Sequence, residues 1–190
     1  MTTPNPLDRL AELIREIAVV HGQVTLSSGR TASYYVDMRR LTLHHEGAPL
    51  IGHLMLDMLE EAGFGVGEID AVGGPTMGAD PVVSAIQHAA ASRGLDLDAF
   101  LVRKEAKGHG MRRQVEGPAI DGRRVVIVED TTTTGGSPMM AVEAARNAGA
   151  QVLAVATILD RQTEATQVFA RAELPYLSLL STGALGLPAQ

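Results

Sequence analysis

The feature that most constrains this chain is an apolar run, Val-Val-Ile-Val at 125–128, followed by two acids, four threonines and Gly135-Gly136-Ser137. A short apolar run between polar segments is typical of a buried strand. The helical pattern that begins at Ser137 then indicates a strand that passes through a tight loop into a helix. A chain built around such a unit folds as alternating strands and helices.

The alternation extends along most of the chain. We predict helices at residues 7–20, 48–62, 79–92, 137–148 and 162–172. We predict strands at residues 69–72, 99–102, 125–128, 152–159 and 176–180, and two short strands around a Ser-Gly turn within 24–37. Strands separated by helices favour a mainly parallel sheet with both faces covered. The predicted fold class is therefore α/β, with one domain over 1–190 and a small N-terminal α+β hood at 1–45.

Composition excludes several classes of protein. The chain has 190 residues, of which 45% are hydrophobic, and this suits one domain with a buried core. It has no cysteine, which excludes disulfides and thiolate chemistry. A net charge of −6 disfavours a general nucleic-acid binder. Neither a membrane-length apolar run nor a secretory signal is apparent, so we expect a cytoplasmic protein with no nucleic-acid or membrane partner.

Residues 129–137 have the properties of a site for a phosphorylated sugar. A helix N-terminus offers free N–H groups and a positive dipole end to a phosphate, and threonine hydroxyls add donors. The carboxylates of Glu129 and Asp130 would repel a phosphate but suit ribose hydroxyls or a metal ion. The segment matches neither the Walker loop nor the dinucleotide fingerprint. The alternative is an ordinary Ser/Thr-capped turn, although four threonines exceed what capping needs.

A basic segment follows the strand predicted at 99–102. Residues 103–113 hold five of the chain's 16 Lys and Arg, together with two glycines and a histidine. Cations placed against a departing pyrophosphate would stabilise its developing charge, and a closing loop would exclude water. We therefore expect a flexible loop at 103–118. A solvated charged hairpin is the alternative that the residues leave open.

The acidic pair and the Thr/Gly loop resemble the phosphoribosyl pyrophosphate signature of type I phosphoribosyltransferases. The resemblance implies that Glu129 and Asp130 hold the ribose hydroxyls and that Asp130 acts in catalysis. It implies that the residues of the following loop wrap the 5-phosphate. These residues are Thr131, Thr132, Thr133, Thr134, Gly135, Gly136 and Ser137.

The basic segment resembles the R-K-x-x-K-x-H-G loop of orotate phosphoribosyltransferases in particular. That resemblance implies that four of its side chains contact the diphosphate and that Lys107 and His109 act in catalysis. The four are Arg103, Lys104, Lys107 and His109. It also implies a homodimer in which the loop reaches the neighbouring site. Mg²⁺ is expected to be carried by the diphosphate, with no metal site formed by the protein alone.

The acceptor site is also implied by resemblance. Residues 28–35 match the family's S-G-R-x-x-x-Y-[FY] element, which would place Tyr34 and Tyr35 around the pyrimidine, with Thr133 touching it. Arg161, at the end of a predicted strand, could grip the orotate carboxylate bidentately. Strand packing for the tyrosines and a surface ion pair for Arg161 are the plainer alternatives.

Two departures from the family pattern are visible. Ser27 precedes S-G-R where many members have lysine, and Met77-Gly78 stands where many have Tyr-Lys. Four arginines are candidates to replace the missing cations: Arg39, Arg40, Arg112 and Arg113. The resemblance implies transfer of phosphoribosyl to orotate. Another base phosphoribosyltransferase and a non-catalytic regulator of the same fold are the alternatives.

Overall fold

The computed structural model describes residues 5–25, 31–104 and 114–187. Its helical elements are α1 Pro6–Leu13, the π-helix η1 Ile14–Ala18, α2 Arg39–Thr42, α3 Gly47–Glu61, α4 Ala79–Ser92, α5 Gly136–Asn147 and α6 Ala165–Arg171. Its strands are β1 Val19–Thr25, β2 Thr31–Val36, β3 Ala71–Pro75, β4 Asp98–Val102, β5 Val115–Glu116, β6 Arg124–Thr132, β7 Gln151–Asp160 and β8 Tyr176–Ser181. Within these residues, no helix has the length and apolar character that crossing a bilayer requires.

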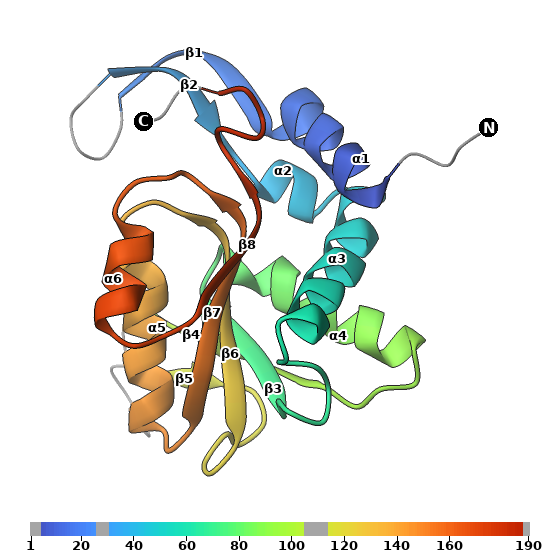
Figure 1. The fold of residues 1–190 in the computed structure, drawn as a ribbon, viewed down its shortest axis with the longest axis vertical. Helices are drawn as coiled ribbons and strands as arrows, with labels where there is room; N and C mark the ends of the chain where they lie inside the picture. Colours follow the sequence, from blue (N-terminus) through green and yellow to red (C-terminus); the bar gives the residue numbers. More distant parts are fainter. Residues whose placement is uncertain (1–4, 26–30, 105–113, 188–190) are drawn as a thin grey trace.

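Six strands form the central sheet in the order β5-β4-β3-β6-β7-β8. Neighbours from β4 to β8 pair in parallel, and only the two-residue edge strand β5 is antiparallel. Helices α3 and α4 cover one face of the sheet, and α5 and α6 cover the other (Figure 1). The predicted α/β class with a mainly parallel sheet is therefore confirmed.

Strand β6 shows why the sheet needs helices on both faces. Val126 and Val128 belong to the hydrophobic cluster that includes α3 and α4. Val125 and Ile127 belong to the cluster that includes α5 and α6. All four are fully buried, as expected when successive side chains of a strand point to opposite, covered faces.

The N-terminal elements correct the prediction of one helix over 7–20. The helix ends at Ala18, and Val19 and Val20 already pair with Val36 and Tyr35 of β2. Both residues are β-branched and gain cross-strand partners, which favours a strand over a further helical turn. The first strand thus begins five residues earlier than predicted. The Ser-Gly turn lies outside the described residues.

Four other boundaries differ from prediction. Strand β3 begins two residues later than expected and continues through Gly73-Gly74-Pro75, where we expected a loop. Strand β6 continues through Thr132, because its pairing with β7 extends to Thr132 and Asp160. The polar stretch 104–122 contains β5, and α6 begins only at Ala165. The short helix α2 was not predicted. The other predicted helices and strands agree within one residue at each end.

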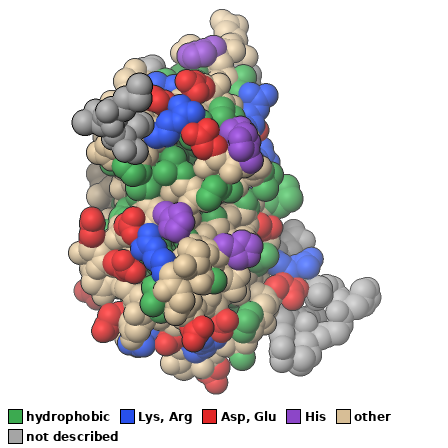
Figure 2. Space-filling model, turned by 90° about the vertical axis from the view of Figure 1, so that its right-hand side faces the viewer, with side chains coloured by type: hydrophobic (Ala, Val, Ile, Leu, Met, Phe, Trp, Pro, Cys, Tyr) green, Lys and Arg blue, Asp and Glu red, His purple; other side chains and the backbone are tan. Residues whose placement is uncertain are grey.

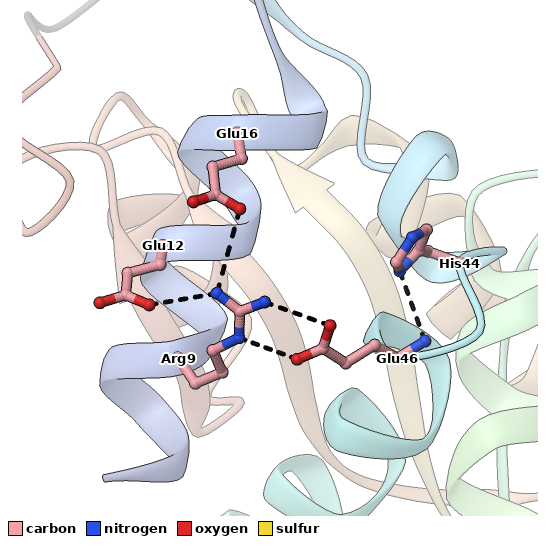
Figure 3. A network of polar contacts seen from close by, with 5 residues as sticks. All are labelled: Arg9, Glu12, Glu16, His44 and Glu46. Carbon is pink, nitrogen blue, oxygen red and sulfur yellow. Dashed lines mark hydrogen bonds and ion pairs between the residues drawn. The ribbon is translucent and has the colours of Figure 1, made fainter. Parts of the chain in front are cut away.

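The side chain of Arg9 connects α1 to the start of α3 (Figure 3). Its Nε and Nη2 donate to the two carboxylate oxygens of Glu46 at 2.8 and 3.1 Å, and Nη1 contacts Glu12 at 3.2 Å. The hydrogen bonds from Arg9 lower the pKa of the Glu46 carboxyl. This bidentate pair holds α1 over the amino end of α3.

Candidate functional site

A cleft of about 1000 Å³ opens at the carboxyl ends of β3 and β6. Its lining comes from the end of β2 and the residues after it (35–39), from residues 75–80 between β3 and α4, from 103–104, and from the end of β6 with the loop that follows. The carboxyl ends of parallel strands are where open α/β sheets bind ligands. The fold therefore brings three of the segments singled out in the sequence to one place.

The acidic pair lies at the floor of this cleft. Glu129 is only 6% exposed, and its burial together with the adjacent Asp130 raises its pKa to about 8. Burial also raises the pKa of Asp130, while hydrogen bonds from Thr131 act in the opposite direction. One Asp130 oxygen, Oδ1, accepts from the Thr131 N–H at 2.5 Å and from its hydroxyl at 3.2 Å. The pair is thus a poorly solvated acceptor site that polar hydroxyls of a ligand could satisfy.

Gly78 lies so close to the acidic pair that a side chain at this position would have to displace the carboxylates. A Cβ built on Gly78 would lie 2.4 Å from Glu129 Oε1 and 2.9 Å from Asp130 Oδ1. The Met77-Gly78 departure therefore has a steric reason in this conformation, since a larger residue at 78 would displace the carboxylates. Met77 itself is 66% exposed at the rim.

The loop after β6 leads into the amino end of α5. Gly135, the N-cap residue, has a φ of 80°, a left-handed conformation that glycine adopts readily. Thr131, Thr133 and Ser137 line the cleft. Thr132 is 1% exposed, because the segment is still a strand there and alternate side chains point away. Thr134, Gly135 and Gly136 belong to the same turn but are not among the lining residues.

The cleft has fewer basic than acidic side chains among the described residues. Three cations line it, namely Arg39, Arg103 and Lys104. Four acids line it, namely Asp37, Asp80, Glu129 and Asp130. Lys107 and His109 lie outside the described residues, as do Ser27, Arg112 and Arg113. Of the arginines considered as replacements for the missing cations, Arg39 lines the cleft, and its Nε donates to Asp37 Oδ1 at 3.0 Å.

Arg161 lies beside the cleft with a buried and poorly satisfied side chain. It is 9% exposed, and within the described part of the chain its Nε and Nη2 have no hydrogen-bond partner. Its guanidinium carbon is 5.7 Å from the centre of the Tyr35 ring. Tyr35 lines the cleft, whereas its neighbour Tyr34 is 2% exposed and belongs to the core. A buried guanidinium of this kind favours an anionic, planar ligand group.

Two acids of the cleft, Asp37 and Asp80, were not predicted as site residues from the sequence. Asp80 lies in the first turn of α4, its Oδ1 is buried without a hydrogen-bond partner among the described residues, and burial raises its pKa. Its place in the Gly-Pro-Thr-Met-Gly-Ala-Asp segment, next to a helix start, was the available signal. Within the same described residues, no three His, Cys, Asp or Glu side chains are arranged to hold a metal ion.

Comparison with known proteins places these features in a family. Residues 39–169 match the family described as the phosphoribosyl transferase domain. An orotate phosphoribosyltransferase of Streptomyces coelicolor is 59% identical over 179 residues, covering 94% of this chain and 96% of that protein.

Two solved structures of Mycobacterium tuberculosis orotate phosphoribosyltransferase are also similar. The structure in complex with Fe(III) dicitrate has a TM-score of 0.85 at 49% identity, covering 96% of this chain and 100% of that one. The structure in complex with 5-phospho-alpha-D-ribosyl 1-diphosphate has a TM-score of 0.82 at 44% identity, with the same coverage.

Proposed function

Since the chain belongs to the orotate phosphoribosyltransferase family, we propose that it transfers the 5-phosphoribosyl group of phosphoribosyl pyrophosphate to N1 of orotate. The products are orotidine 5′-monophosphate and pyrophosphate, and the reaction serves pyrimidine biosynthesis. The observation that carries the proposal is the buried guanidinium of Arg161, which has two nitrogens without partners among the described residues and lies next to Tyr35. Among the pyrimidine and purine bases, orotate is distinguished by a carboxylate that would satisfy it.

The donor occupies the cleft with its ribose over the acidic pair. Glu129 and Asp130 accept hydrogen bonds from the ribose hydroxyls, and Asp130 stabilises the positive charge that develops on the sugar as its bond to pyrophosphate lengthens. The 5-phosphate binds at the amino end of α5, surrounded by residues 131–137. The left-handed Gly135 and the position of Thr131, Thr133 and Ser137 in the lining of the cleft support this arrangement.

The leaving diphosphate needs more positive charge than the described cleft supplies. Arg103, Lys104 and Arg39 provide part of it. Lys107 and His109 complete the set when their loop closes, and Lys107 then neutralises charge as pyrophosphate departs. Mg²⁺ would enter the cleft bound to the diphosphate, whose negative charge it would neutralise. Carboxylates line the cleft, but among the described residues no three of them are arranged as metal ligands.

The acceptor binds between the hood and the end of β7. Arg161 grips the orotate carboxylate, Tyr35 faces the ring, and Thr133 approaches it from the phosphate loop. Tyr34 supports Tyr35 from the core side of β2. Deprotonated orotate attacks the sugar carbon from its nitrogen, and the closed loop excludes the water that would compete.

We further propose that the protein is a cytoplasmic homodimer with shared active sites, in which residues 1–190 form one catalytic domain. Among the described lining residues there are four acids and three cations, and the proposal assigns the further positive charge to the basic loop of a second copy. Figure 2 shows the face that carries α1, α3 and α4, where hydrophobic and histidine side chains lie among charges of both signs. Leu43, at a hollow on α3 and α4, is 74% exposed. Sedimentation at the assay concentration tests the dimer.

The test of the function is an ultraviolet assay with purified protein, Mg²⁺, phosphoribosyl pyrophosphate and one base at a time. We expect consumption of orotate and none of uracil, adenine or hypoxanthine, because only orotate pairs with Arg161. Turnover of another base alone would overturn the assignment of Arg161 while leaving the donor site intact. Inactivity with every base would refute the enzymatic function.

We predict that Gly78→Ala raises the KM for phosphoribosyl pyrophosphate roughly tenfold, since forcing a methyl group into a packed site typically costs about 1–3 kcal/mol. The reason is that the new Cβ would collide with Glu129 Oε1 and Asp130 Oδ1. Steady-state kinetics with each substrate varied in turn measures the effect. Gly65→Ala is the control for a glycine outside the cleft, since no left-handed φ is required there and the new Cβ would lie 3.3 Å from the Glu60 side chain. An unchanged donor KM would contradict the steric account.

A further inference from the structure

The segment that follows β8, residues 182–187, contacts two parts of the molecule that each supply one side of the acceptor site. It runs from the edge of the main sheet to the hood, beside α1 and the β1–β2 pair (Figure 1). Its Leu185 is 4% exposed and belongs to the same core cluster as Leu13 and Ile14. The segment is therefore packed in place rather than loosely attached.

On the hood side, the segment is held by Arg15 of η1. Arg15 Nε donates to the carbonyl of Leu185 at 3.2 Å, and its Nη2 donates to the carbonyl of Ala184 at 3.4 Å. Strand β1 follows η1 directly and pairs with β2, which carries Tyr35. The contact thus anchors the strand pair that presents Tyr35 to the cleft.

On the sheet side, the segment is held by Gln162, the residue after Arg161. The Gln162 side-chain oxygen accepts from the Gly183 N–H at 2.8 Å and from the Thr182 hydroxyl at 3.4 Å. Gln162 has a φ of 56°, a left-handed conformation that Asn or Gly adopts more readily. Gln162 keeps this costly conformation while its amide oxygen is hydrogen-bonded to the 182–187 segment, which indicates a positioning role.

Arg161 needs such external support because two of its guanidinium nitrogens have no hydrogen-bond partner among the described residues. Its backbone N–H donates to the Thr132 carbonyl at 3.0 Å, but Nε and Nη2 have no hydrogen-bond partner in the described residues. The direction of its guanidinium therefore depends on the turn at 161–163 and on the distance to the Tyr35 ring. Both are set by elements that the 182–187 segment connects.

Building on the proposed function, we propose that Gln162 and Arg15 are positioning residues, which use the 182–187 segment as a brace to hold Arg161 against Tyr35. The brace sets the affinity for the carboxylate-bearing base and leaves the donor site alone. It makes no contact with either substrate. Its loss should therefore appear as a selective change in orotate binding.

The test compares two variants of nearly equal size at one position. Gln162→Met removes the acceptor oxygen, whereas Gln162→Glu keeps an oxygen that can accept from Gly183. We expect Gln162→Met to raise the KM for orotate about fivefold, the effect of losing a hydrogen bond or two. The KM for the donor and kcat should stay within about twofold, and Gln162→Glu should restore orotate binding. Arg15→Met should act like Gln162→Met, and Arg171→Met, exposed on α6, is the control.

A second measurement separates the brace from the proposed function. Hydrogen–deuterium exchange of the ligand-free protein should be faster at 161–163 and 182–187 in Gln162→Met than in the wild type and unchanged in Gln162→Glu. Unchanged exchange, or donor and orotate KM values that rise together, would overturn the brace. If the wild type consumes no orotate, the proposed function fails, and the brace is decided by the exchange result alone.

Discussion

Arg161→Met is expected to lower kcat/KM for orotate by about 10² to 10³-fold, because truncating one partner of a buried charge pair typically costs 2–5 kcal/mol. The donor KM should remain near the wild-type value, since Arg161 is not among the residues that line the donor cleft. The variant should also discriminate less between orotate and uracil, because the buried cation that penalises uracil is gone. Steady-state kinetics with both acceptors measures these effects.

The same variant should not be less stable than the wild type without ligand. Arg161 is buried, and two of its nitrogens lack partners within the described residues, so methionine removes an unsatisfied charge and keeps the apolar stem. Arg161→Lys keeps the charge but loses the two-pronged geometry and should show an intermediate loss of activity. Equal loss for donor and acceptor, or full orotate activity in Arg161→Met, would remove Arg161 from the acceptor site.

The central elements could be predicted because their pattern is local. The Ala-rich helix α4 and the apolar strands β7 and β8 have periodicities that burial on one or two faces produces, and they were found within one residue of prediction. Boundaries that depend on a distant partner could not be found this way. Strand β1 begins at Val19 because of β2, and β6 ends at Thr132 because of β7.

The sequence identified the segments that form the candidate site, but not which of their side chains face the cleft. Thr131 and Thr132 read alike in the sequence, yet only Thr131 lines the cleft, because the strand continues and side chains alternate. The same alternation places Tyr34 in the core and Tyr35 at the cleft. For the tyrosines, the family resemblance had placed both side chains around the pyrimidine, and the alternation along the predicted strand was not applied. The role of Gly78 had no sequence signal beyond a departure from a family pattern.

Glu129→Gln is expected to have opposite effects on activity and on stability. Activity should fall about 10 to 100-fold in kcat/KM, the effect of weakening a hydrogen bond to a charged group. Without ligand, the variant should be more stable than the wild type at alkaline pH, because the wild type must ionise a carboxyl that is 6% exposed and adjacent to Asp130. The site therefore has a carboxylate that is costly to the empty protein and useful once hydroxyl groups occupy the cleft.

The sign of the pH dependence follows from the raised pKa. The folded protein keeps the Glu129 proton up to a pH of about 8, whereas the unfolded chain loses it near the ordinary value of 4.5. Between these limits the folded state binds more protons, so this residue lowers the free energy of unfolding as pH rises, by at most about 1.4 kcal/mol per pH unit. Urea unfolding at pH 5, 6.5 and 8 should therefore show the advantage of Glu129→Gln growing to about 2–4 kcal/mol.

The control for this experiment is Glu143→Gln, a carboxyl exposed on α5. At this exposed position the substitution should leave the free energy of unfolding within about 0.5 kcal/mol of the wild type. An advantage of Glu129→Gln that stays constant from pH 5 to 8 would mean that Glu129 is ionised throughout in the empty cleft. Saturating phosphoribosyl pyrophosphate should make the wild type more stable than Glu129→Gln at pH 8. The ribose hydroxyls then compensate the ionised carboxylate of the wild type, so the ligand binds folded wild type more tightly than the folded variant.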